Sequence, residues 1–324
     1  MKKVLFGTLV ILAFFYGAAV GRYKMFPYQV IKQAKHSLTA VAAPSRFELA
    51  HSDASRDQQI VSIDLGYSDI SQKQEIPCGT IDMTNTMVAL TFGQSNATNE
   101  GETRYSSGKS VYNFYEGKCY RAADPLLGAT GGKGSVWTRL GDMIIDSELY
   151  SNVIFVSIGV SGTSMSQWKQ EGDSFQRIVK IKSQLDQENI RLTHLLWHQG
   201  EGDAEMGTKK HDYMTMLADM IDGIRRLGIN APLYVAIATR CKGPINADIQ
   251  EAQMELAAER DDVFMGANTD TLSDMDDRYD FCHFSDAGLK KHASLWLEAI
   301  QYGDSGKHPR WTPTESGMHT SSTW

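Results

Sequence analysis

Residues 153–158 read VIFVSI and residues 233–238 read LYVAIA, and these two runs decide the fold. Each run is short, rich in aliphatic residues and largely apolar at consecutive positions, so both faces of the strand that it forms have to be covered. Strands buried on both faces are typical of parallel sheets that lie between two layers of helices. The two runs therefore predict an α/β fold.

The rest of the chain alternates between further apolar runs and amphipathic stretches. We expect a three-layer α/β/α sandwich with a parallel sheet, formed by one domain over residues 81–305. A polar stalk over residues 25–80 precedes it, and a tail over residues 306–324 follows. The expected strands are residues 87–92, 153–160, 193–197, 233–238 and 263–267, and the expected helices are residues 136–145, 175–187, 210–227, 247–260 and 286–300.

The composition excludes several classes of protein. The 324 residues carry 32 Lys and Arg against 39 Asp and Glu, which gives a net charge of −7. This acidic balance disfavours nucleic acid as a partner. With 42% hydrophobic and 22% charged residues, the chain is neither disordered nor collagen-like, and it is not a small disulfide scaffold. It has the composition of a globular protein with a large core.

An uncharged run over residues 4–21 follows Lys2 and Lys3 near the N-terminus. As a helix it is about 27 Å long, close to the roughly 30 Å of a bilayer core. An uncleaved membrane anchor, a cleaved signal peptide and a buried core helix all fit, and we favour the anchor. In that case residues 1–24 make the membrane a partner, and the domain that follows lies outside the cytoplasm.

The four cysteines are interpreted in the light of that location. Outside the cytoplasm Cys78, Cys119, Cys241 and Cys282 can form disulfides, and four cysteines allow three pairings. We favour Cys78 with Cys119 and Cys241 with Cys282, because each bond then joins loops within one half of the chain. Free buried thiols remain an alternative.

Ser95 stands in the sequence GQSNA over residues 93–97, directly after the first long apolar strand. A serine in a tight turn between strand and helix points its hydroxyl outwards, and the neighbouring N–H groups can face an oxyanion. Ser95 is therefore a candidate nucleophile. A helix cap is the alternative, because serine is common at that position.

Two further loops follow expected strands. Gly162 lies in SGTSMSQW over residues 161–168, where a glycine lets the backbone approach a ligand and present its N–H, although a plain turn also fits. Residues 197–203 read WHQGEGD, and burying so many polar groups costs free energy unless they are paired or functional. We expect the WHQGEGD loop to belong to a functional site.

Asp280 and His283 stand in the sequence DFCH before an amphipathic helix. A carboxylate at this spacing can accept one ring N–H, fix the tautomer and leave the other nitrogen as a general base. The alternative is a helix-entry loop that is capped by Asp286 and in which His283 has no role.

The succession of GQSN, SGTS, WHQGEGD and DFCH closely resembles the SGNH-hydrolase superfamily, and within it the sialate O-acetylesterase-like carbohydrate esterases. The resemblance covers residues 87–300. It implies a flavodoxin-like sheet and the hydrolysis of an O-acetyl or other short acyl ester on a sugar, without a metal or a cofactor. The implied partner is an acetylated carbohydrate, such as an acetylated sialic acid or polysaccharide.

The resemblance also assigns roles by position. Ser95 is the nucleophile, His283 the general base and acid, and Asp280 the carboxylate that orients the histidine. The implied oxyanion donors are the N–H groups of Ser95 and Gly162 and the side chain of Gln199, which stands where most of the superfamily has asparagine. The residues that match the family pattern and are expected to have supporting roles are Gln94, Asn96 and Glu201.

Other sites and functions fit the sequence less well. Residues 128–135 (GATGGKGS) lack the spacing of a phosphate loop, and the acidic residues 270–280 lack EF-hand spacing for calcium. A hydrolase elbow of the G-x-S-x-G type is disfavoured because Asp280 and His283 share one turn. A glycan-binding protein without turnover and an acyltransferase remain as alternatives, and the complete set of serine, histidine and aspartate favours an enzyme.

Overall fold

The computed structural model describes residues 66–306. The expected anchor over residues 4–21 and the tail after residue 306 lie outside the described residues. Within residues 66–306, no helix combines the length and the apolar character that crossing a bilayer requires.

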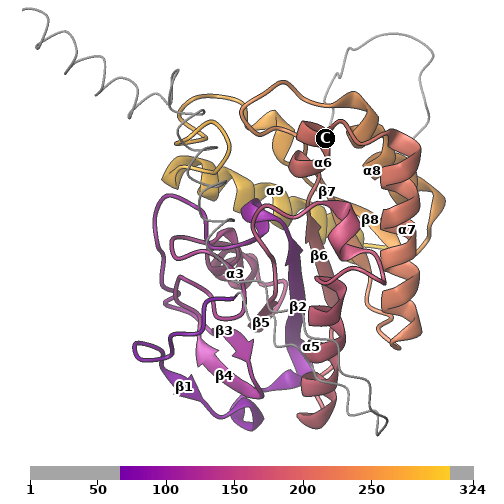
Figure 1. Cartoon of the computed structure of the whole chain (residues 1–324). Helices are drawn as coiled ribbons and strands as arrows, with labels where there is room; N and C mark the ends of the chain where they lie inside the picture. Colours follow the sequence, from indigo (N-terminus) through magenta and orange to yellow (C-terminus); the bar gives the residue numbers. More distant parts are fainter. Residues whose placement is uncertain (1–65, 307–324) are drawn as a thin grey trace, which may run out of the picture. The chain divides into compact units, whose positions relative to one another are not determined.

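The described chain forms one 8-stranded sheet in the order β1-β4-β3-β5-β2-β6-β7-β8 (Figure 1). The strands from β3 to β8 in this order run parallel to one another, and only β4 and β1 are joined in antiparallel fashion at one edge. The strand bounds are β1 Glu75–Ile76, β2 Thr86–Gly93, β3 Val111–Tyr115, β4 Lys118–Arg121, β5 Asn152–Ser157, β6 His194–His198, β7 Leu233–Ile237 and β8 Val263–Asn268.

Helices cover both faces of this sheet, as the two apolar runs predict (Figure 1). Along β2, Val88 and Leu90 pack with α5, α7 and α8 on one face, whereas Met87 and Ala89 pack with α3 and α9 on the other. This alternation with a period of two residues makes β2 buried throughout. The helix bounds are α3 Val136–Asp146, α4 Met165–Trp168, α5 Phe175–Gln187, α6 Glu201–Met206, α7 Lys210–Arg226, α8 Ala247–Glu259 and α9 Asp286–Asp304.

Three short strands were not expected from the sequence. In β3, Asn113 interrupts the apolar pattern, yet its side chain is buried because it donates to the Phe155 carbonyl and accepts from the Leu127 N–H. In β4, which lies next to the two-residue edge strand β1, Lys118 is exposed and Arg121 is half-buried. Polar residues at such positions hide a strand from a hydrophobic pattern.

The stalk boundary expected at residue 81 is wrong. Residues 66–80 belong to the domain, since β1 pairs with β4 and the Tyr67 N–H donates to the Ala129 carbonyl. Lys73 is held there as well, because its ammonium group donates to two backbone carbonyls, those of Ala123 and Pro125. The few apolar residues in this segment gave no signal of that packing.

Two disulfides join the pairs that the sequence analysis favoured, Cys78 with Cys119 and Cys241 with Cys282. The first ties the 3₁₀ turn Cys78–Thr80 to β4 at the sheet edge. The second joins the segment after β7 to the DFCH segment. The alternative of free buried thiols is wrong, because no cysteine remains unpaired.

A polar cluster fixes the end of α9 beside the sheet. Asp304 accepts hydrogen bonds from His194 Nε2 at 3.0 Å and from the Tyr234 hydroxyl at 2.9 Å through Oδ1, and from the Tyr150 hydroxyl at 2.8 Å through Oδ2. His194 is the first residue of β6, and Tyr234 lies in β7. One carboxylate therefore holds α9, β6 and β7 together.

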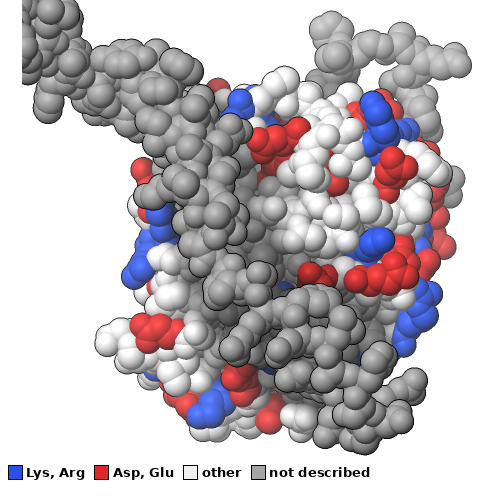
Figure 2. Space-filling view, viewed as in Figure 1, with Lys and Arg blue, Asp and Glu red and all other residues white. Residues whose placement is uncertain are grey.

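Charges are dispersed on the face that Figure 2 shows. Acidic and basic side chains are interspersed there, with uncharged surface between them, and neither sign forms a continuous field. The described residues that are visible on that face form no basic stripe of the kind that binds a phosphate backbone.

Candidate active site

The turn after β2 is built by glycine and sets Ser95 in place. Gly93 has a φ of +125°, and a Cβ at this position would lie 2.0 Å from the His198 carbonyl oxygen. The Gln94 N–H donates to that same carbonyl at 3.0 Å. Because β2 and β6 approach so closely, only glycine fits, and the chain passes directly into the 3₁₀ turn Ser95–Ala97.

A cavity of about 420 Å³ opens beside this turn. Ser95 and Gly162 line it, as does His283 from the segment before α9. These residues come from three loops that are far apart in sequence, and the sheet brings the loops together because ligand sites form at the carboxyl ends of parallel strands. The structure thus unites the predicted nucleophile, one predicted oxyanion donor and the predicted base.

His283 is held by Asp280 within the His283 loop (residues 280–283). The ring Nδ1–H donates to Asp280 Oδ2 at 2.8 Å, and the N–H groups of His283 and Cys282 donate to Oδ1 at 2.7 and 3.1 Å. Partial burial raises the pKa of Asp280, but these hydrogen bonds outweigh it and hold the pKa well below its usual value. Asp280 is therefore ionised, and Nε2 is the ring nitrogen left for Ser95.

Ser95 Oγ and His283 line the same cavity without a hydrogen bond between them. In apo enzymes such contacts are often long and shorten in the complex with substrate. The backbone N–H groups of Ser95 and Gly162 donate to no other atom within residues 66–306. Two unoccupied donors thus border the cavity beside the Ser95 hydroxyl.

The expectation that Gln199 supplies a third oxyanion donor is wrong. Its side chain is fully buried and does not line the cavity. Nε2 donates to Asp203 Oδ2 at 2.5 Å and to Gln94 Oε1 at 3.2 Å, so both amide hydrogens are engaged. Gly200 follows directly with a φ of +153°. This turn directs the Gln199 side chain into the interior, and the family pattern alone does not reveal that direction.

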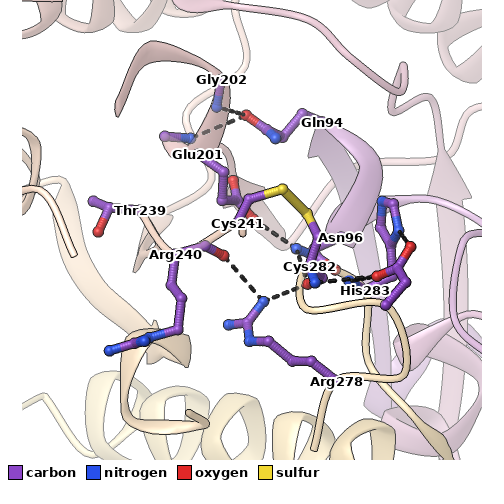
Figure 3. Close-up of a disulfide and its surroundings, with 12 residues drawn as sticks. Gln94, Asn96, Glu201, Gly202, Thr239, Arg240, Cys241, Arg278, Cys282 and His283 are labelled. Carbon is purple, nitrogen blue, oxygen red and sulfur yellow. Dashed lines mark hydrogen bonds and ion pairs between the residues drawn. A yellow bond between two sulfur atoms is a disulfide. The ribbon is translucent and has the colours of Figure 1, made fainter. Parts of the chain in front are cut away.

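Gln94, and not Gln199, presents a side-chain amide to the cavity. It lines the cavity, and its Oε1 accepts the Gly202 N–H at 2.9 Å (Figure 3). A backbone donor on Oε1 fixes which way the amide is turned. Nε2 has no hydrogen-bond partner within the described part of the chain, so the structure leaves a third donor beside Ser95.

Asn96 and Glu201 lie behind the cavity in a buried polar cluster. Asn96 Nδ2 donates to Glu201 Oε1 at 2.7 Å, and His198 Nε2 donates to the same oxygen at 3.2 Å. Burial raises the pKa of Glu201, but His198 and the hydrogen bonds lower it by more. The net pKa lies below its usual value, so the carboxyl stays ionised. The expected supporting residues Gln94, Asn96 and Glu201 are thus all beside the turn that carries Ser95.

The sequence analysis did not identify every residue of the cavity. Cys241, Cys282 and Lys242 line it together with Glu205. Lys242 has a φ of +60°, and its ammonium group forms no ion pair within residues 66–306. The favoured pairing of Cys241 with Cys282, next to His283, was the one signal that could have drawn attention to this wall of the cavity.

Three of the acidic residues in 270–280, namely Asp270, Asp277 and Asp280, are engaged in contacts within the protein. Asp270 accepts from the Thr239 and Arg240 N–H groups, and Asp277 binds Lys291 at 2.8 Å. No group of three or more His, Cys, Asp or Glu side chains in the described residues is arranged to hold a metal ion.

The three-layer α/β/α fold also occurs among solved structures. A solved structure of a protein from Arabidopsis thaliana shares it, with a TM-score of 0.54 and 17% identity over 69% of this chain and 99% of that one. Similar to a lesser degree are NanS, with a TM-score of 0.49 and 13% identity over 70% and 100%, and a carbohydrate acetylesterase from Xanthomonas citri, with 0.45 and 14% over 68% and 57%. No curated protein sequence matches the chain.

The chain belongs to the family of carbohydrate esterases described as sialic acid-specific acetylesterases, whose sequence profile matches residues 85–300. It is therefore a carboxylic ester hydrolase that removes O-acetyl groups from a carbohydrate. The matched range contains every residue that lines the cavity.

Proposed function

We propose that Ser95 is the nucleophile of this acetylesterase, His283 its general base and acid, and Asp280 the residue that orients His283. One observation carries the proposal. Ser95 and the His283 ring, which is held by an ionised Asp280, line a single cavity that unoccupied N–H donors border. Nucleophile, base and orienting carboxylate are the parts that acyl transfer through a serine needs.

In the first step the Ser95 oxygen attacks the acetyl carbonyl carbon while Nε2 of His283 takes the hydroxyl proton. The carbonyl π electrons move to oxygen, and the oxyanion is bound by the N–H groups of Ser95 and Gly162 and by Gln94 Nε2. Each such donor contributes roughly 3–4 kcal/mol to the transition state. His283 then returns the proton to the departing sugar oxygen, and an acetyl-serine remains.

In the second step water replaces the sugar. His283 takes a proton from water as its oxygen attacks the acetyl-serine, and the same donors bind the second oxyanion. Collapse of the intermediate releases acetate and returns the proton to Ser95. The ionised Asp280 stabilises the imidazolium that forms in both steps.

The finer substrate class that we propose is an O-acetylated sialic acid. The family description supports it, and so does Lys242, which lines the cavity and has no ion pair within the described residues. A carboxylate on the sugar is a suitable partner for such a cation. An acetylated neutral polysaccharide is the alternative substrate.

We further propose that the domain acts outside the cytoplasm and is tethered to a membrane by residues 4–21. Two disulfides support the location, because such bonds persist in oxidising compartments. The uncharged run after Lys2 and Lys3 supports the tether.

The test compares Ser95→Ala with Ser161→Ala in the full-length protein. Ser161 lines the same cavity, but its hydroxyl is engaged with Glu100 and Thr130 at 3.0 Å each. We expect Ser95→Ala to abolish acetate release from 4-nitrophenyl acetate and from O-acetylated sialic acid, whereas Ser161→Ala retains turnover. Acetate release by Ser95→Ala at the wild-type rate would refute the proposed nucleophile.

A further inference from the structure

The disulfide between Cys241 and Cys282 forms part of the cavity wall next to the base. Both cysteines line the cavity, and Cys282 is the residue directly before His283 (Figure 3). The bond joins the His283 loop to the β7 loop (residues 239–246). It is therefore a covalent link between the residue before the proposed base and a second strand end.

The outer end of the His283 loop is held by hydrogen bonds within its own segment, from the Cys282 and His283 N–H groups to Asp280 and from the Tyr279 N–H to the His283 carbonyl. Phe281 adopts a φ of +67°, a conformation that a bulky residue rarely takes, and its side chain is 60% exposed. Its own packing therefore does not impose this backbone shape. The Phe281 carbonyl accepts the Lys242 N–H at 2.9 Å, so the backbone hydrogen bond that ties Phe281 to another loop comes from the residue next to Cys241.

The inner end of the loop is anchored by polar groups. The Cys282 carbonyl accepts hydrogen bonds from Arg278 Nη1 and from Asn96 Nδ2, and Arg278 also donates to the Arg240 carbonyl (Figure 3). These bonds fix the backbone at Cys282 relative to Asn96 and hence to Ser95. They act at Cys282, whereas the turn at Phe281 is closed by the bonds to Asp280 and is tied to the β7 loop by Lys242 and by the disulfide.

We propose that the Cys241–Cys282 disulfide is a positioning element for His283, so that its reduction slows turnover of the folded enzyme. This inference rests on the proposed roles of Ser95 and His283. Once the bond is open, the turn at Phe281 can relax from its disfavoured conformation, and the His283 ring moves relative to Ser95. Misplacement of a catalytic group by about 1 Å can cost roughly a hundredfold in rate.

The second disulfide provides a matched control. Cys78 and Cys119 are separated by 41 residues, and so are Cys241 and Cys282, so the two bonds restrict the unfolded chain to a similar extent. Neither Cys78 nor Cys119 lines the cavity. Loss of either bond should therefore have a similar effect on unfolded-state entropy, and only loss of Cys241–Cys282 should affect His283.

The experiment uses the full-length variant Cys78→Ala/Cys119→Ala, in which Cys241–Cys282 is the one remaining bond among the four cysteines of the chain. Dithiothreitol supplies two electrons and two protons, which convert the bond to two thiols while the reagent closes to a cyclic disulfide. Half-buried Cys241 lets the reagent approach from the cavity. Free-thiol titration reports complete reduction, and kcat and KM for acetate release are measured before reduction, after it and after reoxidation.

We expect reduction to lower kcat at least about tenfold, with KM changed less than about threefold, and reoxidation to restore kcat. The variant Cys241→Ala/Cys282→Ala should have the low kcat with or without reductant, whereas Cys78→Ala/Cys119→Ala before reduction should match the wild type. An unchanged kcat after complete reduction overturns the proposal. Global unfolding on reduction also overturns it, because the bond would then hold the whole fold and not one loop.

Hydrogen exchange read by mass spectrometry tests the same idea without relying on catalysis. Exchange at the Cys282 and His283 amides should accelerate on reduction, while exchange in β2 stays slow. If exchange accelerates on reduction but the wild-type enzyme releases no acetate, the disulfide still positions the His283 loop, and the proposed catalytic roles of Ser95 and His283 fail. Unchanged exchange at these two amides refutes the positioning role, whatever the activity.

Discussion

Asn96 Nδ2 donates a 2.7 Å hydrogen bond to Glu201 Oε1, which ties the residue after Ser95 to the first residue of α6. Both side chains are buried, and Glu201 is ionised because His198 and Asn96 donate to it. The turn that presents the nucleophile is thus stabilised by a hydrogen bond from the Asn96 amide to the Glu201 carboxylate.

Replacement of Asn96 tests this pairing. Asn96→Ala removes the hydrogen bond to Glu201 and the longer one to the Cys282 carbonyl, and it should lower the free energy of unfolding by about 1–3 kcal/mol. Asn96→Asp places a second carboxyl against Glu201 and should cost more, about 3–5 kcal/mol at pH 8, because a buried charge is left without compensation. Urea unfolding measures both. At pH 5 the extra cost of Asn96→Asp should shrink, since a protonated carboxyl can donate to Glu201, and equal losses for the two variants would contradict the pairing.

Gln94 is expected to act on the transition state. Gln94→Glu keeps an acceptor for the Gly202 N–H and removes the Nε2 donor, so kcat should fall roughly 10²- to 10³-fold while the fold is retained. Gln167→Glu is the control, because Gln167 lines the same cavity and its Oε1 accepts the Ser164 N–H. Gln167→Glu introduces the same negative charge into the cavity but leaves the Gln94 Nε2 donor in place. Comparable losses of kcat in both variants would show that charge alone is responsible.

The depressed pKa of Asp280 has a consequence for stability. A carboxyl with a lower pKa in the folded than in the unfolded state contributes stability above the unfolded value of about 4, and this stability is lost as pH falls. The difference in unfolding free energy between wild type and Asp280→Asn should therefore be largest above about pH 5 and should decrease towards pH 3. Urea titrations at pH 7, 5 and 3 measure it, and a difference that grows on acidification would reverse the sign.

Lys242 is expected to discriminate between acidic and neutral sugars. Lys242→Gln should lower kcat/KM for O-acetylated sialic acid about tenfold, the effect of one charge-assisted hydrogen bond, and leave an acetylated neutral sugar unaffected. Lys133→Gln is the control, since Lys133 binds the Tyr279 hydroxyl and does not line the cavity. An equal loss on both substrates would mean that Lys242 has no contact with a carboxylate.

The central sheet and its helices could be predicted from the sequence because β2, β5, β6 and β7 are apolar on both faces and the helices have one apolar stripe. Strand β3 could not be predicted, because Asn113 is buried by its hydrogen bonds and not by its own hydrophobicity. The expected strand over residues 153–160 ends at Ser157, and Ile158 and Val160 continue beside β2 through single backbone bonds.

The positions of Ser95, Asp280 and His283 in one site followed from the order of the motifs along the chain. The direction of Gln199 did not. Whether an amide at a strand end faces the cavity or the interior depends on the φ of the next residue, Gly200, and on the acceptor Asp203 across the turn. Neither is visible in a pattern that places glutamine where other members have asparagine.

Asp304 sets the limit to which the chain can be shortened from its C-terminal side. Ile300 is the last residue of α9 in the hydrophobic core, so hydrophobicity alone suggests that the last turn is dispensable. In a truncated protein that stops before Asp304, the His194 ring N–H and the hydroxyls of Tyr150 and Tyr234 would lack their hydrogen-bond acceptor. On this side the folding unit therefore extends to one carboxylate, four residues beyond the last residue of the hydrophobic core.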